Sequence, residues 1–225
     1  MENKNVIKPG FKLLEFEELK AIEQIQKSEL FYESLNKRRS VREFSSKELP
    51  NELIENIVKT ASTAPSGAHK QPWVFCVVKS KQIKRDIRIA AEKEEYENYH
   101  GRMSDEWLSD LKKFDTNWEK PFLEKAPVLI IVFKKTFDVE NGDKKKNYYV
   151  NESVGIATGM LLAAIHNAGL VALTHTPSPL NFLAKLLKRP ENEKPYLLIP
   201  VGYPEKNTQI PCLKRKELSE ILYYY

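Results

Sequence analysis

Residues 51–78 read NELIENIVKTASTAPSGAHKQPWVFCVV, and this stretch decides the class of fold. Its first part predicts a helix over 51–62, because apolar residues recur at helical spacing on one face: Leu53, Ile54, Ile57, Val58 and Ala61. The segment 63–69, which contains Pro and Gly, breaks that helix. The apolar run over 73–78 then predicts a strand. A helix, a tight turn and a strand therefore follow one another within one short segment.

The alternation of helices and strands continues on both sides of this segment. Before it, a charged amphipathic pattern predicts an N-terminal helix over about 11–36. After it, we expect helices over 81–93, 148–168 and 182–188, and strands over 128–133, 170–174 and 196–201. Strands separated by helices indicate an α+β fold with a central mixed sheet flanked by helices. We expect residues 1–225 to form a single domain.

Residues 94–125 differ from the rest of the chain. They are dense in charge and carry scattered large rings, namely Tyr96, Tyr99, Trp107, Phe114, Trp118 and Phe122. A polar insert of this length is too long for an idle connection, and such inserts often cover active sites. We therefore expect an active-site lid over about 94–125.

The charge and hydropathy patterns exclude several classes of protein. The 36 basic and 31 acidic residues are interleaved, with a net charge of +5, so we expect no nucleic-acid partner. The lysines over 144–146 follow Gly142, and we interpret them as a solvated turn rather than a nucleic-acid site. The longest apolar run, 128–133, is far shorter than the ~20 residues of a membrane span. No hydrophobic targeting segment follows Met1–Asn5, so we expect no membrane partner.

The usage of cysteine and histidine points to a cytoplasmic protein without a metal site. The 2 cysteines are far apart and form no CxxC pair, and Cys76 lies in a predicted strand, where a buried thiol is expected. The 4 histidines have no metal-ligand spacing. The sequence also lacks GxGxxG, GxxxxGK[ST], GxSxG and HExxH. Gly155 and Gly159 lie one turn apart on a predicted helix, where they favour close packing against another helix or a second subunit.

Three arginines, Arg38, Arg39 and Arg42, crowd beside Ser40 at the start of the folded core. They are either surface charge or, if their guanidinium groups converge, a site for a phosphate group. A second basic cluster over 214–216 would be able to close on the same anion. The turn around Ser66 offers a hydroxyl and backbone N–H groups that can hold polar ring edges.

These segments together resemble the FMN-dependent nitroreductase superfamily, and more closely its iodotyrosine deiodinase branch. The resemblance spans about residues 30–218 and rests on matching segments: 38–42, 64–69, 71–73, 110–113, 116–118, 167–171, 174–177, 200–204 and 213–216. It implies the nitroreductase type of α+β fold and a homodimer, in which FMN lies at the subunit interface and both chains build each site.

The resemblance also implies the residues that hold the cofactor. Arg38, Arg39, Arg42 and Arg215 would hold the FMN phosphate and ribityl chain, with Ser40 among them. Pro65 and Ser66 would line the flavin, and Thr174, His175 and Thr176 would pass along its edge. Thr176, the catalytic candidate, would hydrogen-bond flavin N5, a contact that suits transfer of electrons one at a time. His175 departs from the pattern, because related deiodinases can carry a third threonine there.

A substrate would stack on the flavin as a flat ring, with its phenolate at the backbone N–H of Ala68. The resemblance assigns Glu95 to the substrate ammonium, Lys120 to its carboxylate, and Tyr99 to an assisting role. Charge-assisted hydrogen bonds contribute about 1.5–3 kcal/mol each, so this trio would favour an amino acid over a plain phenol. The alternative from composition alone is that Glu95 and Lys120 are two of many charges on a solvated helix.

The resemblance therefore implies FMN-dependent reductive dehalogenation of halotyrosines, with NAD(P)H or a reductase partner as the electron donor. A broad-specificity NAD(P)H-dependent nitroreductase or quinone reductase on the same fold is the alternative. Two further alternatives are a module that binds flavin or tyrosine without turnover and a flavin-destroying enzyme. We expect no membrane anchor of the kind that animal members of the branch carry.

Overall fold

The computed structural model describes residues 7–225, and the chain divides into two compact units between Lys37 and Arg38. The prediction made at Met1–Asn5 lies outside the described residues. In the first unit, helix α1 covers Ala21–Asn36 and begins well after residue 11, where the pattern placed its start. The side chain of Glu23 accepts a hydrogen bond from the backbone N–H of Lys20 over 3.1 Å, which caps the helix at this point. The prediction of a helix over 11–36 was therefore wrong for its first part.

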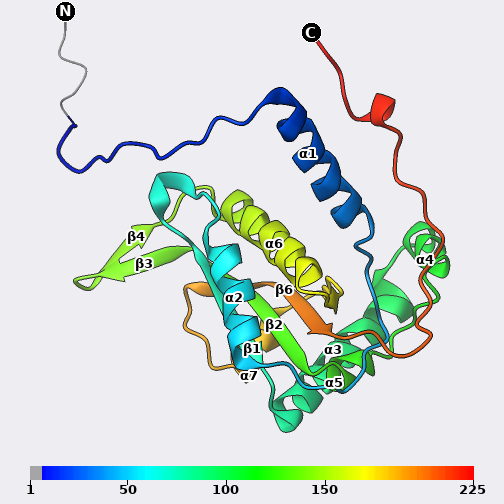
Figure 1. The fold of residues 1–225 in the computed structure, drawn as a ribbon. Helices are drawn as coiled ribbons and strands as arrows, with labels where there is room; N and C mark the ends of the chain where they lie inside the picture. The colour runs from blue at the N-terminus through cyan, green and yellow to red at the C-terminus, as the bar shows by residue number, and fades with distance from the viewer. Residues whose placement is uncertain (1–6) are drawn as a thin grey trace, which may run out of the picture. The chain divides into compact units, whose positions relative to one another are not determined.

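The second unit is built on a 4-stranded sheet in the order β1-β2-β6-β5, of which Figure 1 labels β1, β2 and β6. Its strands are β1 (Trp73–Val78), β2 (Val128–Lys135), β5 (Val171–Ala172) and β6 (Glu193–Gly202). Neighbouring strands in this order all pair antiparallel. Within the described residues, the parallel contact of this sheet is an isolated bridge between Ser40 and Ala172. The helices that separate the strands in sequence thus connect mostly antiparallel neighbours, and a single bridge makes the sheet mixed.

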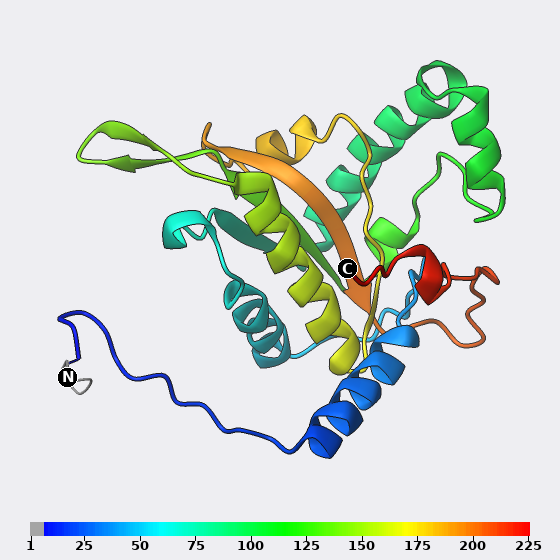
Figure 2. The same ribbon diagram turned by 90° about the horizontal axis from the view of Figure 1, so that it is seen from above.

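Helices cover both faces of the sheet (Figure 2). One face carries α2 (Asn51–Ser62) and α6 (Val150–Asn167). The other carries α3 (Lys81–Glu97), α5 (Phe122–Lys125) and α7 (Asn181–Leu186). The helix over 51–62 is confirmed, and the other predicted elements are found with their ends shifted by a few residues.

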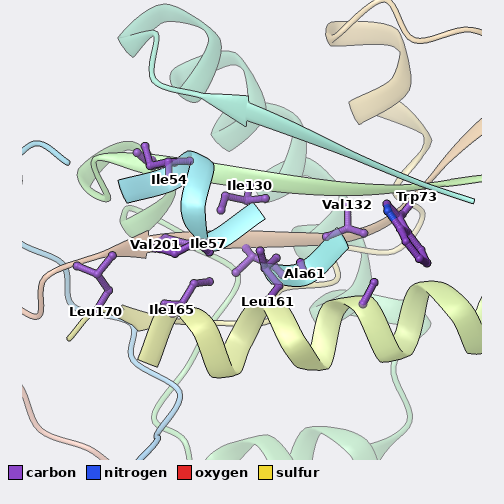
Figure 3. Packing of buried hydrophobic residues seen from close by; sticks show 14 of the residues in the cluster. Ile54, Ile57, Ala61, Trp73, Ile130, Val132, Leu161, Ile165, Leu170 and Val201 are labelled. Atoms are coloured by element: carbon purple, nitrogen blue, oxygen red, sulfur yellow. The ribbon is translucent and has the colours of Figure 1, made fainter. Parts of the chain in front are cut away.

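Strand β2 explains why this sheet has two covered faces. Its residues alternate between two hydrophobic clusters, as side chains on a strand must. Ile130 and Val132 pack with Ile54, Ile57 and Leu161 of α2 and α6 (Figure 3). Leu129, Ile131 and Phe133 face α3, α5 and α7 instead, and all three are fully buried. A strand buried on both sides needs an uninterrupted apolar run, which is the pattern over 128–133.

Two local predictions need correction. Lys144, Lys145 and Lys146 form strand β4 (Asp143–Lys146), which pairs with β3 (Phe137–Glu140), and only Asn141 and Gly142 make the turn between them. The lysines are exposed, as expected, but they belong to a hairpin because their backbone pairs with Phe137–Val139. Cys76 is half-buried rather than buried, since β1 lies at an edge of the sheet.

Backbone pairing brings two distant parts of the chain together beside β6. The N–H of Val41 donates to the carbonyl of Ala172 over 3.2 Å, next to the Ser40–Ala172 bridge. The chain after β5 continues along β6, where the N–H of His175 donates to the carbonyl of Leu198 over 2.9 Å. The arginine-rich segment and the Thr174–Thr176 segment therefore lie at the same edge of the sheet. None of the helices in residues 7–225 combines the length and apolar character that crossing a bilayer requires.

Candidate functional site

The arginine-rich segment lines a cavity of about 290 Å³, which we call the cationic cavity. It contains six of the predicted cofactor residues, Arg38, Arg39, Ser40, Arg42, Thr174 and Arg215. Its remaining lining residues are Phe114, Leu173, Pro211, Leu213 and Lys214. The predicted convergence of the two basic clusters is thus present, and the guanidinium groups are gathered around one cavity instead of being dispersed over the surface.

Two hydrogen bonds hold the C-terminal basic segment against the start of the core. Nη2 of Arg39 donates to the carbonyl of Pro211 over 2.5 Å, and Nη2 of Arg215 donates to the carbonyl of Arg38 over 3.3 Å. Val41, which lies between Arg39 and Arg42 in the sequence, is buried and anchors the arginine-rich segment in the core. Burial lowers the pKa of Arg42, although a guanidinium remains charged at neutral pH.

A second cavity of about 160 Å³, which we call the lid cavity, lies under the predicted lid. Its predicted residues are Arg42, Glu95, Tyr99, Lys120, Thr174, His175 and Thr176. Arg42 and Thr174 also line the cationic cavity, so the two cavities share a wall. The structure therefore places the predicted amino-acid-binding trio next to the predicted flavin-edge segment.

Glu95 and Lys120 form a buried ion pair in the lid cavity. Nζ of Lys120 lies 3.4 Å from Oε2 of Glu95, and their side chains are only 4% and 7% exposed, respectively. Burial raises the pKa of Glu95 and lowers the pKa of Lys120, while the attraction between the two charges opposes both changes. Removing one member of a buried pair leaves the other charge without compensation, which is strongly unfavourable. These two residues are therefore not solvated surface charges, and that alternative is wrong.

Three elements position the trio. Helix α3 carries Glu95 on its buried side, and the π-helical turn over Asn98–Arg102 that follows it carries Tyr99. The backbone N–H of Lys120 donates to Oε1 of Glu92 over 2.6 Å, which ties the end of the lid back to α3. The Tyr99 hydroxyl donates to the carbonyl of Thr116 over 3.4 Å, and Nζ of Lys120 lies 5.2 Å from the centre of the Tyr99 ring. The lid thus folds back on itself around the ion pair.

The segment Thr174–Thr176 alternates in exposure because it runs alongside β6. Thr174 and Thr176 are exposed, whereas His175 is buried with its ring edge-to-face against Phe122, 5.5 Å between centres. Burial, followed by the positive charges of Lys120 and Arg42, lowers the pKa of His175 to about 3. Its Nε2 has no hydrogen-bond partner among the described residues. His175 is therefore a neutral imidazole beside two cations.

The structure does not bring Pro65, Ser66 and Ala68 to either cavity. Their turn lies at the N-terminal end of α6, where the N–H of Gly67 donates to Oγ of Ser153 over 3.4 Å. The cationic cavity lies beyond the other end of this helix, and the helix axis spans roughly 20 Å between Ser153 and Asn167 at 1.5 Å per residue. Ala68 is exposed at φ 48°, in the left-handed region that non-glycine residues rarely adopt.

Sequence reasoning missed several lining residues. In the lid cavity these are Met103, Trp107, Leu111, Thr116, Phe122 and Leu173. Met103, Trp107 and Leu111 recur every four residues, so a search for helical faces within the lid would have found the wall that α4 (Asp105–Lys112) contributes. Thr116 lies in the matching segment 116–118, but no signal marks Leu173, because its position depends on pairing with Pro200 of β6.

Comparisons with known proteins show the family of the chain. The family model described as the nitroreductase family matches residues 35–203. An iodotyrosine deiodinase from Haliscomenobacter hydrossis is 63% identical over 204 residues, covering 90% of this chain and 92% of that protein. Human iodotyrosine deiodinase 1 is 52% identical over 204 residues, covering 89% of this chain and 70% of the human protein.

A solved structure gives the same result. The crystal structure of oxidized iodotyrosine deiodinase bound to FMN and 3-iodo-L-tyrosine superposes with a TM-score of 0.75 at 32% identity. The match covers 87% of this chain and 98% of the other chain. The chain belongs to the nitroreductase family and, within it, to the iodotyrosine deiodinases.

Proposed function

We propose that this protein is an FMN-dependent oxidoreductase that removes halide reductively from halotyrosines. The observation that carries the proposal is the buried Glu95–Lys120 pair, which lies in one cavity with Thr174, His175 and Thr176. Relatives that share more than half of this sequence are named iodotyrosine deiodinases, and the solved relative holds FMN and 3-iodo-L-tyrosine together.

The cationic cavity suits the phosphate end of FMN. Arg38, Arg39, Arg42 and Arg215 supply charged N–H donors around one space, and a phosphate accepts paired hydrogen bonds from such groups. The exposed hydroxyls of Ser40 and Thr174 suit the ribityl chain. When bound, FMN supplies the electrons for reduction, and the protein supplies binding, orientation and charge.

The lid cavity suits the zwitterionic end of an amino acid. Glu95 would receive the substrate ammonium group and Lys120 its carboxylate, so that each exchanges one partner for another without remaining unpaired. Tyr99 would assist them, since it already contacts Lys120. The rings and apolar side chains of Met103, Trp107, Leu111 and Phe122 would exclude water from the aromatic end of the substrate. An amino acid head group therefore explains both buried charges.

The segment beside β6 would face the reacting end of the bound ligands. The exposed hydroxyl of Thr176 is the group we propose to contact flavin N5, with Thr174 alongside it. His175 is held by two backbone hydrogen bonds to Leu198 and would fix the position of both threonines. Its neutral imidazole adds no positive charge beside Arg42 and Lys120.

We also propose that the protein is a homodimer. The turn that contains Pro65, Ser66 and Ala68 lies at the opposite end of α6 from the cationic cavity of the same chain. A second copy would bring its own turn to the place where the cationic cavity and the lid cavity meet, and the Ala68 N–H would there reach the substrate phenolate. Each site would then contain groups from both chains.

The electron donor that we propose is NAD(P)H or a reductase partner. The two free cysteines, Cys76 and Cys212, are consistent with the reducing cytoplasm in which we propose the protein acts.

Halide release from iodo-, bromo- and chlorotyrosine by the FMN-loaded protein under dithionite tests the proposal. We expect release from the wild type and a loss of at least a hundredfold in kcat/KM in Lys120→Ala, which leaves Glu95 buried and unpaired. Lys93→Ala is the matched control, because Lys93 is exposed on the same helix as Glu95. Wild-type activity is expected there.

Two other outcomes would replace the proposal. Rapid nitroarene or quinone reduction that is unaffected by Lys120→Ala, without halide release, would indicate a broad-specificity nitroreductase or quinone reductase. Tight binding of halotyrosine without any halide release from the reduced protein would indicate a binding module without turnover.

A further inference from the structure

Phe114 is a lid residue that belongs to the cationic cavity. It is half-buried and lines that cavity together with Arg38, Arg39 and Arg215, although it comes from the segment that covers the lid cavity. The guanidinium carbon of Arg42 lies 5.5 Å from the centre of its ring, within the range of a cation–π interaction. An aromatic ring from the lid therefore rests on an arginine of the cofactor site.

The local backbone directs Phe114 to this position. Helix α4 ends at Lys112, and the N–H of Phe114 donates to the carbonyl of Leu111 over 2.9 Å. Asp115 then turns the chain at φ 47°, in the left-handed region. Because Trp107 and Leu111 of the same helix line the lid cavity, the position of α4 decides the position of Phe114.

Arg42 is the residue that joins the two cavities. It lines both, and it meets Phe114 at the boundary between them. In the observed position, α4 lines the lid cavity through Trp107 and Leu111 and also places the Phe114 ring on Arg42. Opening of the lid would remove that ring from the wall of the cationic cavity.

We propose that Phe114 couples substrate binding to retention of FMN, and that it acts as a positioning residue through Arg42. This inference rests on the proposed function, since it takes FMN and a halotyrosine as the two ligands. Bound halotyrosine holds the lid closed, Phe114 covers the phosphate end of the cofactor, and FMN leaves more slowly. Coupling between binding affinities is reciprocal, so bound FMN strengthens halotyrosine binding by the factor by which halotyrosine strengthens FMN binding.

The test measures FMN release from the oxidised, FMN-loaded protein after dilution, as recovery of free flavin fluorescence, with and without 3-iodo-L-tyrosine. No reductant is present, so no turnover occurs. We expect iodotyrosine to slow release in the wild type. In Phe114→Ala, the slowing should shrink by roughly three- to thirtyfold, which is the value of one cation–π contact. Phe114→Tyr should restore it, and Lys112→Ala, at an exposed position of α4 outside both cavities, should leave it unchanged.

The outcomes separate this inference from the proposed function. If iodotyrosine slows FMN release equally in the wild type and in Phe114→Ala, the role of Phe114 is refuted. If iodotyrosine binds but has no effect on release, the coupling is refuted, while halide release continues to support the proposed function. If the protein binds no FMN, both this inference and the proposed function are refuted. A Phe114→Ala variant that loses the slowing, and whose FMN-loaded form binds iodotyrosine more weakly than the wild type by a similar factor, supports the inference.

Discussion

Among the individual residues, His175 makes the stability of the fold depend on pH. The folded protein holds the pKa of His175 at about 3, whereas the unfolded chain has the ordinary histidine value of 6.5. Between these values the unfolded chain binds a proton that the folded chain does not, so stability falls as the pH falls from 6.5 toward 3. The decrease is at most about 1.4 kcal/mol per pH unit for one group.

The measurement is urea unfolding of the wild type and of His175→Thr at saturating FMN between pH 7 and pH 4. We expect the free energy of unfolding of the wild type to fall more steeply with decreasing pH than that of the variant. Equal slopes for the two proteins would mean that His175 takes up its proton in the folded state.

Gly202 at the end of β6 is a second residue that affects stability, because its backbone leaves no space for a Cβ atom. A Cβ added there would lie 2.6 Å from Cδ and 2.9 Å from Cγ of the Pro127 ring. Because a proline ring cannot move aside, Gly202→Ala should destabilise the fold by about 1–3 kcal/mol. The comparison is Gly101→Ala in the lid, where an added Cβ meets no atom within 4 Å and stability should be nearly unchanged. The denaturation midpoints of the two variants, compared with that of the wild type, test this prediction.

Among the helices and strands, the sequence predicted those whose apolar residues recur at the spacing of the face that packs in the core. Strand β2 was predictable because each face of the strand needs its own apolar residues, and α2 because its apolar stripe covers the sheet. The β3–β4 hairpin was not, since lysines are poor strand formers and only backbone pairing with Phe137–Val139 makes them a strand. The amphipathic pattern before Ala21 likewise did not reveal that α1 is capped there.

The same reasoning divides the residues of the site. The arginine cluster could be predicted from its own charges, because three guanidinium groups lie within five residues, whereas the trio of Glu95, Tyr99 and Lys120 could be predicted only from the resemblance to a known family. Phe114 could not be assigned to the cofactor side, because its place depends on a turn at Asp115 and on the path of the whole lid. Tertiary contacts determine the position of such residues, and no short sequence motif indicates it.

Helix α6 offers a test of the proposed homodimer. Its buried face carries Val154, Ala157, Leu161 and Ile165, whereas Gly159 and Ile156 are exposed on the rest of its surface. An added Cβ at Gly159 meets no atom of the same chain within 4 Å. Gly159→Leu should therefore leave the fold of one chain intact and weaken close approach by a second copy.

We expect light scattering to show a dimer for the wild type and for Gly159→Ala, and a shift toward monomer with reduced FMN content for Gly159→Leu. A dimer of unchanged stability in Gly159→Leu would show that this part of α6 lies outside the subunit interface.

Over the full length of the unit 38–225, the site depends on the chain returning to where its core begins. Arg215 follows the last strand, β6, and its guanidinium group donates to the backbone carbonyl of Arg38, the first residue of the unit. If Arg215 holds the FMN phosphate, then Arg215→Met should weaken FMN binding about ten- to hundredfold, which corresponds to one charge-assisted hydrogen bond. Binding of riboflavin, which has no phosphate, should change little.

Lys216→Met tests the same tail one residue away, at an exposed position outside the cationic cavity, and should bind FMN as the wild type does. Equal losses for FMN and riboflavin would instead mean that the tail supports the fold of the site and does not bind the phosphate.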